Sequence, residues 1–368
     1  MDYKERTLKF HQLYRSKIAP IFEQYETERK LELIKYVLGM FFAVLCFLAP
    51  IGLFMLGRYW GGQNANYLII GMFISIIVGA VTVFVCKDIP KDFAMKLKQG
   101  CLPYILKLFN DIEWRNNENI IADTRLERSG LFGEFNIRHT DDEFIGSFKD
   151  VPFKICETDL WYESGSSRRK TCMRVFKGVV ISFKANKEVK NRTMIATKGD
   201  ITKANQYLLA IPAVLYLIVE LLAKGFNPFV TFGIAIGVFV IMYVIQTQIQ
   251  NSDEPLNKVT LEDPRFCNKF NAYSSDQVEA RYLLTTAFIE RFQNLQTAFG
   301  TNKAKCSFLK SSFDDEVIIA ISTKKNLFEL GSIFKSLRNP ESINGFYNEL
   351  SSIYNMVGYF KLDQKIGL

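Results

Sequence analysis

The sequence has little histidine and no cysteine spacing of the kind that binds zinc. Only two histidines occur among the 368 residues, His11 and His139, which excludes a histidine-rich metal site. The seven cysteines contain no CxxC pair, and Cys46 and Cys86 lie in apolar runs. Neither a structural metal nor a disulfide framework is therefore expected.

Common catalytic and nucleotide-binding motifs are missing as well. The chain contains no GxxxxGK[ST], GxGxxG, HExxH or GxSxG sequence, and we expect no cofactor. The first apolar run begins near Ile34, behind a charged leader, whereas a cleavable signal peptide would place its apolar core earlier. No signal peptide is predicted, and whether the protein is an enzyme stays open.

Long uncharged runs are what the sequence does have. Those from about Ile34 to Leu56 and from about Tyr67 to Cys86 each approach the roughly 20 apolar residues that cross a hydrocarbon core. A third run, Tyr207 to Ile245, is broken by turn residues at Ala223–Pro228, which indicates two short spans. The predicted fold class is α+β, with helical membrane hairpins (four spans) and a mixed α+β cytoplasmic body.

The distribution of basic residues gives an orientation. Arg58 is the only basic residue in the connector of the first hairpin, and Lys224 is the only one in the turn of the second. Lysines and arginines gather outside both hairpins, so the positive-inside rule predicts that both termini are cytoplasmic. These basic flanks account for much of the net charge of +8 and fit membrane lipids as partners, so no nucleic acid partner is expected.

The chain divides into five segments on this reading. They are an amphipathic helical leader with a break at Pro20 (1–33), a first transmembrane hairpin (34–86), a first part of the cytoplasmic body (87–206), an inserted second hairpin (207–248) and a second part of the body (249–368).

Local patterns predict the elements of the body. Strands are expected at Phe144–Phe153, Cys172–Phe183 and Glu316–Ser322, with the polar loop Ser164–Lys170 as a hairpin tip. Ser274 and Gln277 have capping-box spacing, which predicts one helix ending at Gly300 with Val278 and Tyr282 facing the core. A closing helix should begin after Asn339 with Pro340 in its first position.

Several of these segments carry a family resemblance. The chain resembles the bacterial domain-of-unknown-function family 3137 in the stretches Ser129–Phe132, Phe176–Phe183, Leu261–Phe266, Ser274–Thr285 and, more weakly, Leu327–Leu330. The resemblance implies a charged leader, two N-terminal spans and a cytoplasmic body in a bacterial inner membrane protein. It implies no activity, and the apolar stretch from about Tyr207 to Ile245 departs from the pattern.

Two groups of charged residues are candidate contact sites. Arg168, Arg169 and Lys170 form a compact basic tip, which is either a solvated loop or a contact for anionic lipid or phosphate. Glu279 and Arg281 lie in the most specific stretch of the resemblance, and they serve either the structure or a protein partner of unknown identity.

Three classes of function follow. The favoured one is a membrane-tethered binding or regulatory module. Glu220, a carboxylate in an apolar run, supports a transport or channel component as an alternative. The Asp141-Asp142-Glu143 cluster beside His139 supports an enzyme of unfamiliar type, although adjacent carboxylates on a strand or turn point in different directions.

The orientation can be tested by thiol labelling. In a cysteine-free background, single cysteines at Asn64 and Asn227 should react with a membrane-impermeant thiol reagent in intact cells, because each tip carries only one basic residue and basic residues are retained inside. Cysteines at Ser166 and Ser312 should stay protected until the cells are opened. Labelling of Ser166 or Ser312 in intact cells would reverse the orientation.

Overall fold

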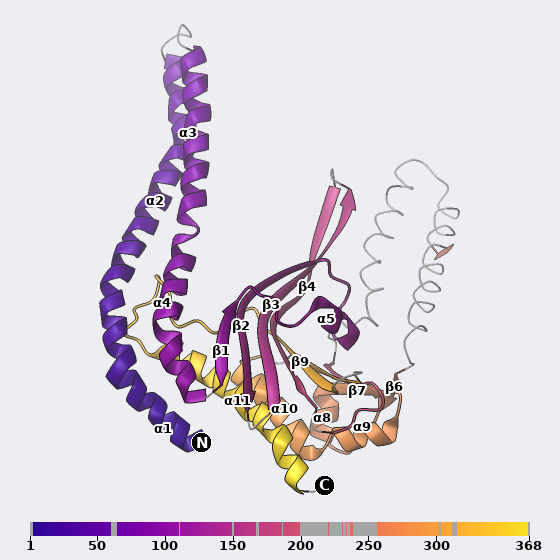
Figure 1. Cartoon of the computed structure of the whole chain (residues 1–368). Helices are drawn as coiled ribbons and strands as arrows, with labels where there is room; N and C mark the ends of the chain where they lie inside the picture. Colours follow the sequence, from indigo (N-terminus) through magenta and orange to yellow (C-terminus); the bar gives the residue numbers. More distant parts are fainter. Residues whose placement is uncertain are drawn as a thin grey trace. The chain divides into compact units, whose positions relative to one another are not determined.

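A computed structural model gives the fold of the chain (Figure 1). It describes residues 3–59, 65–109, 111–148, 151–166, 169–185, 187–198, 256–301, 303–310 and 315–366, and the single positions 220, 230, 233, 236 and 237. Two compact units are formed, Met1–Asn110 with Phe328–Asn348 and Asp111–Leu327 with Glu349–Leu368.

The first unit is helical. Its elements are α1 (Tyr3–Leu13), a π-helical turn η1 (Tyr14–Ile18), α2 (Ala19–Tyr59), α3 (Ala65–Cys86), α4 (Ile89–Leu106) and a 3-10 turn η2 (Lys107–Phe109). Pro20 is predicted to kink or split the leader helix, but the helix runs on through it, and a π-helical turn ends two residues before the proline. Proline has no amide hydrogen to donate, and wide turns of this kind absorb such an interruption.

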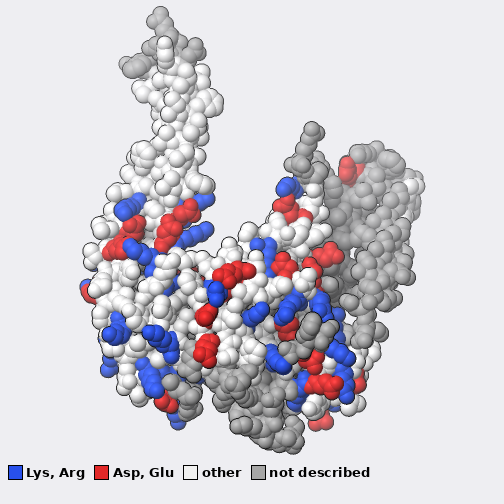
Figure 2. Space-filling view, viewed as in Figure 1, with Lys and Arg blue, Asp and Glu red and all other residues white. Residues whose placement is uncertain are grey.

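Two helical segments are long and apolar enough to cross a membrane, Lys4–Leu56 and Tyr67–Phe109. Their most apolar stretches are only 11% and 6% buried within the protein. Large side chains such as Phe41 and Phe73 are more than half exposed, and the shaft of α2 and α3 in Figure 2 is white above a charged base. The mixed α+β fold and these two candidate spans agree with the prediction. The predicted second hairpin, 207–248, lies almost entirely outside the described residues.

Small residues bring α2 and α3 close together. A Cβ atom built on Gly79 would lie 3.1 Å from the Cys46 Cβ and 3.4 Å from the carbonyl oxygen of Ala43. Ser75 and Thr82 donate their hydroxyl hydrogens to the carbonyls of Met72 and Val78, both at 2.8 Å, so neither hydroxyl needs water. Such packing suits an apolar medium, where contact between helices depends on close backbone approach.

The second unit is built on one antiparallel sheet. In the described part of the chain the sheet has nine strands in the order β1-β2-β3-β4-β9-β8-β5-β7-β6. The strands are β1 (Ile112–Asn116), β2 (Ile137–Phe148), β3 (Val151–Ser166), β4 (Arg169–Lys184), β5 (Thr193–Thr197), β6 (Asn257–Val259), β7 (Phe270–Ser274), β8 (Ala304–Leu309) and β9 (Glu316–Ser322).

Both faces of the central strands are covered. On one face, α5 (Asp123–Ser129) and the loops around it bury Phe176, Val180 and Ile318 in one cluster. On the other, Phe288 and Phe292 of α10 (Thr286–Ala298) pack against Phe308 and Phe270. Burial on both sides explains why β9 reads as an unbroken apolar run.

The closing helix, α11 (Glu341–Ile366), begins one residue later than predicted. Asn339 accepts a hydrogen bond through Oδ1 from the amide of Glu341 at 3.1 Å, and Pro340 precedes the first turn. The helical spacing of its apolar residues predicts one buried face. That face is buried in the structure and consists of Phe346, Leu350, Ile353, Tyr354 and Val357.

The predicted capping box is wrong. Ser274 is the last residue of β7, fully buried, and its hydroxyl bonds Thr193 Oγ1 at 2.9 Å. The helix has a different cap, Asp276, whose Oδ1 accepts from the amides of Val278 at 2.7 Å and Glu279 at 3.2 Å. Serine and aspartate both favour the cap position, but Ser274 pairs in the sheet and its hydroxyl is bonded to Thr193, so Asp276 caps the helix.

The shift of the cap also changes the helix that follows. α9 (Gln277–Leu283) is short, and α10 begins separately at Thr286. Val278 and Tyr282 are 74% and 52% exposed, so their predicted place in the core is wrong, and Ala280 and Leu283 are buried instead. The expected stop is confirmed, since Gly300 adopts a φ of 61° after α10 ends.

The cap can be tested by substitution. Asp276→Ala should lower the free energy of unfolding by about 1 kcal/mol, because two backbone amides lose their acceptor. Gln277→Ala, at the next position, is the matched control and should have little effect. Melting temperatures of the full chain in detergent measure both. Equal losses for the two variants would contradict the assignment of the cap.

Candidate functional site

The strands β3 and β4 extend beyond the rest of the sheet (Figure 1). β2 pairs with β3 no further than Trp161, and β9 pairs with β4 only from Gly178 onward. Residues 162–173 are here called the arm. Among its described residues, 162–166 and 169–173 pair as strands only with one another. The predicted hairpin at Ser164–Lys170 is confirmed in outline, but the strands reach into it as far as Ser166 and Arg169.

Ion pairs and a stacked arginine order the side chains of the arm. At its base, Arg174 lies over the Trp161 ring at 4.4 Å, and its Nε is 3.0 Å from Asp159 Oδ1. Further out, Lys170 forms an ion pair with Glu163, which raises the pKa of the lysine. Tyr162 of the arm and Trp161 and Arg174 at its base are of the residue types that dominate protein interfaces.

Of the three basic residues predicted at the tip, the structure describes the side chain of Lys170 alone. Lys170 is exposed and paired with Glu163. Arg169 is the first residue of β4, its side chain lies outside the described part, and Arg168 lies outside the described residues altogether. Since the carboxylate of Glu163 offsets one of the three charges, the tip is less basic than its sequence suggests.

Glu279 makes contacts that serve the structure. Its Oε1 accepts from the amide of Lys190 at 2.6 Å, and its Oε2 accepts from Asn191 Nδ2 at 2.7 Å. The carboxylate thereby fixes the loop that leads into β5. Arg281 is exposed on the same short helix, and no contact between described residues joins either side chain to Lys170.

The acidic cluster is dispersed by the strand that carries it. Glu143 is fully buried and accepts from the amides of Glu118, Asn119 and Ile120 at 2.6–3.0 Å. Asp142 accepts from the indole of Trp114 at 2.8 Å, whereas His139 and Asp141 are exposed. Within the described ranges, no group of three or more histidine, cysteine or carboxylate side chains is arranged to hold a metal.

The buried thiols are chemically quiet. Burial raises the pKa of the Cys156 thiol to about 12, and it raises the pKa of the Cys101 thiol to about 12 as well. Thiols of this kind stay protonated near neutral pH and are poor nucleophiles. The sequence places Cys172 and Cys306 in strand-like stretches, which predicts that both are small core residues. Cys306 is buried as predicted, whereas Cys172 is exposed, so the prediction is wrong for Cys172.

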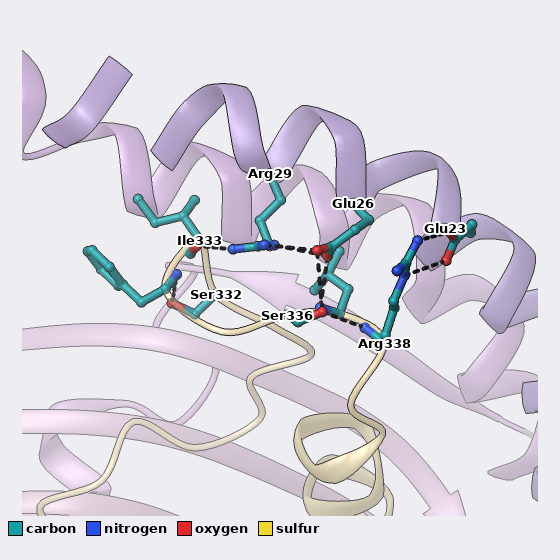
Figure 3. A network of polar contacts seen from close by, with 9 residues as sticks. Glu23, Glu26, Arg29, Ser332, Ile333, Ser336 and Arg338 are labelled. Atoms are coloured by element: carbon teal, nitrogen blue, oxygen red, sulfur yellow. Dashed lines mark hydrogen bonds and ion pairs between the residues drawn. The ribbon is translucent and has the colours of Figure 1, made fainter. Parts of the chain in front are cut away.

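A buried ion pair in the first unit holds a distant loop (Figure 3). Glu26 and Arg29, at 4% and 7% exposed, form two parallel hydrogen bonds of 2.9 and 2.8 Å. Arg29 Nη1 also donates to the carbonyl of Ile333 at 2.6 Å, and Glu26 Oε2 accepts from the amide of Leu337 at 3.0 Å. We call these four residues the clamp.

Two further pairs support the clamp. Arg338 bonds both carboxylate oxygens of Glu23 at 2.6 and 3.2 Å, but this pair is exposed. Lys98 of α4, only 3% exposed, reaches Glu329 at 3.1 Å. Residues 328–340 are thus tied to α2 and α4 at several points.

The clamp was missed by the sequence analysis, although a signal for it existed. Glu26 and Arg29 continue the spacing of Ile18 and Phe22, both buried, along one face of the leader. Charged residues on an apolar face are almost never fully buried unless they are paired. The spacing of Glu26 and Arg29 by three residues indicates that they can pair on one helix face. Their loop partner could not be found in this way, because Ile333 lies 304 residues after Arg29 in the chain.

Comparison with known proteins gives one match. The family model described as "Protein of unknown function (DUF3137)" matches residues 174–362. The match covers strands on both sides of residues 201–255 and the segment that the clamp holds. No curated protein and no solved structure matches the chain.

The clamp predicts a dependence of stability on pH. Hydrogen bonding to Arg29 lowers the pKa of Glu26 from 4.5 to about 2. A carboxylate with a lowered pKa stabilises the folded state fully above about pH 4.5, and that stabilisation is lost as the pH falls toward 2. Glu26→Gln should lower the free energy of unfolding by about 3 kcal/mol near neutral pH, because the buried charge of Arg29 is then left without its partner.

Glu23→Gln is the matched control. It removes an exposed carboxylate one helical turn away and should change the melting temperature little. Melting temperatures of the full chain in detergent at pH 7, 5, 4 and 3 measure the difference, which should shrink below pH 4.5 for Glu26→Gln. A constant difference across this range would refute the role given to the Glu26 charge.

Proposed function

This chain belongs to the DUF3137 family of proteins of unknown function, and we propose that it is a membrane-tethered binding or regulatory module that holds a protein partner. The membrane is the bacterial inner membrane, both termini are cytoplasmic, and the second hairpin at 207–248 crosses it as well. Residues 87–206 and 249–368 make up one cytoplasmic body.

The exposed apolar surface of α2 and α3 carries the proposal. Phe41, Phe73 and Phe84 are each at least 60% exposed, on helices that could cross a membrane. Monomeric soluble proteins rarely expose apolar surface this extended, because each exposed square ångström costs roughly 25 cal/mol in water. Basic residues beside the apolar runs support the orientation, as in the positive-inside rule.

The pairing of β5 supports a single body. β5 precedes residues 201–255 in the chain, whereas its neighbours in the sheet, β7 and β8, both follow them. An inserted hairpin at 207–248 that leaves and returns on one side of the membrane agrees with this arrangement.

The arm supports a binding role. A two-stranded ribbon is at best marginally stable alone, and the open edges of its strands invite pairing with another chain. At Glu163 the side chain of Asn136 already bonds the backbone amide and carbonyl, so the edge available to a partner lies beyond that residue. The base of this ribbon is ordered by Trp161, Arg174 and Asp159. A protein partner suits it better than lipid does, because Glu163 already engages Lys170.

Shortening the arm tests the proposal. Replacing residues 163–172 with Asn-Gly should keep the Tyr162–Met173 pair and close the ribbon with a tight turn. Full-length protein is purified in mild detergent, and the proteins bound to it are quantified by mass spectrometry. The amount of partner protein recovered should fall about ten-fold for the shortened variant, because one strong interface contact is lost.

Val278→Ala is the matched control, because it removes a 74% exposed side chain elsewhere on the second unit. It should leave the partner's recovery unchanged, and both variants should melt like the parent protein. If no bound protein depends on the arm, the assigned binding surface is wrong.

A further inference from the structure

One aromatic side chain in the loop held by the clamp is largely exposed. Phe334 is 57% exposed, whereas Ile333 before it is fully buried and Leu337 is 2% exposed. The clamp binds the backbone of both buried neighbours. Ser332 Oγ also accepts from the Phe334 amide at 3.2 Å, so the exposed ring is presented by an ordered turn.

The ring lies where the first span begins. Phe334 meets Tyr36 of α2 edge to face, with ring centroids 5.3 Å apart. Tyr36 stands two residues inside the apolar run that starts at Ile34. The exposed ring is therefore level with the first turn of the apolar part of α2.

α3 ends at the same level. A Cβ atom built on Gly39 would lie 2.3 Å from Cys86 Sγ, so this part of α2 faces the last residue of α3. Lys87 follows at once, and its Nζ lies 3.8 Å above the Phe84 ring. Lys35 and Lys335 are exposed beside Tyr36 and Phe334 in sequence. Aromatic and basic side chains thus gather at this level. Figure 2 shows the white shaft of α2 and α3 giving way to charged residues at its base.

We infer that Phe334 is a membrane-interface anchor, inserted among the headgroups of the bilayer that α2 and α3 cross. The inference rests on the proposed membrane-tethered function. Aromatic rings favour the headgroup level, and neighbouring lysines extend their amines toward water and anionic lipid. The loop of residues 331–337 is thereby a second contact with the lipid, besides the spans, and it sets the depth of the hairpin.

Lipid is favoured over a protein partner because the ring is continuous with an apolar surface already assigned to lipid. Tyr36, which touches the ring, belongs to the same helix as the exposed Val37, Leu38 and Phe41. A partner protein at Phe334 would have to displace lipid from these neighbours as well.

Site-specific photo-crosslinking tests the anchor. p-Benzoylphenylalanine replaces Phe334 in the full-length protein, which is reconstituted into vesicles of phosphatidylethanolamine and phosphatidylglycerol and irradiated. Phe73, 63% exposed in α3, is the positive control, and Tyr282, 52% exposed in α9, is the negative control. Lipid adducts are quantified by intact mass, and melting temperatures confirm that each variant folds.

The expected result is a lipid adduct at positions 334 and 73, with about ten-fold less at 282, as the interfacial preference of aromatic rings implies. An adduct at 73 without one at 334 overturns the anchor and leaves the proposed function standing. No adduct at 73 overturns the membrane span and the anchor with it. Equal adducts at 334 and 282, or crosslinking of 334 to protein, also overturns the anchor.

Discussion

The buried pair of Glu26 and Arg29 is the interaction on which the first unit depends. It satisfies a carbonyl at Ile333 and an amide at Leu337, two backbone groups that would otherwise be buried without partners. Burying two charges is costly unless both are paired and hydrogen-bonded, and here the pair and the loop satisfy one another. Neither the helix nor the loop supplies the full set of partners, so each requires the other.

This mutual dependence gives α2 two different environments along one helix. Its first turns carry Phe22, Glu26 and Arg29 into a protein interior, where polar groups have defined partners. From Ile34 onward its large side chains are exposed and apolar. The clamp lies close to the change from one environment to the other, and it fixes the turn that presents Phe334.

The sequence predicts elements well where one local pattern dominates. The length of the apolar runs predicted the spanning parts of α2 and α3, and a run of β-branched residues predicted β9. The capping box failed because Ser274 and Asp276 are both good caps, and only the sheet pairing of Ser274 with Thr193 decides between them. Helical periodicity alone cannot separate the two helices that a break at Leu284 and Thr285 divides.

Only part of the candidate site could be predicted from the sequence, for the same reason. A run of basic residues marked the tip of the arm, yet the pairing of Lys170 with Glu163 depends on hairpin register. Trp161 and Arg174 were passed over because their contact crosses two strands. The clamp was hidden by the distance between its halves in the chain, since neither half implies the other.

The strand order of the sheet has a consequence for biosynthesis. When the ribosome has made β1 to β4, the edge of β4 has no neighbour, because β9 pairs with it only after Glu316 is translated. β5 likewise waits for β7 and β8, encoded beyond residue 255. Pairing over such separations is slow, and exposed strand edges aggregate. The nascent chain therefore carries an open sheet over the synthesis of more than a hundred residues, and folding of the sheet can finish only after β9 has been translated.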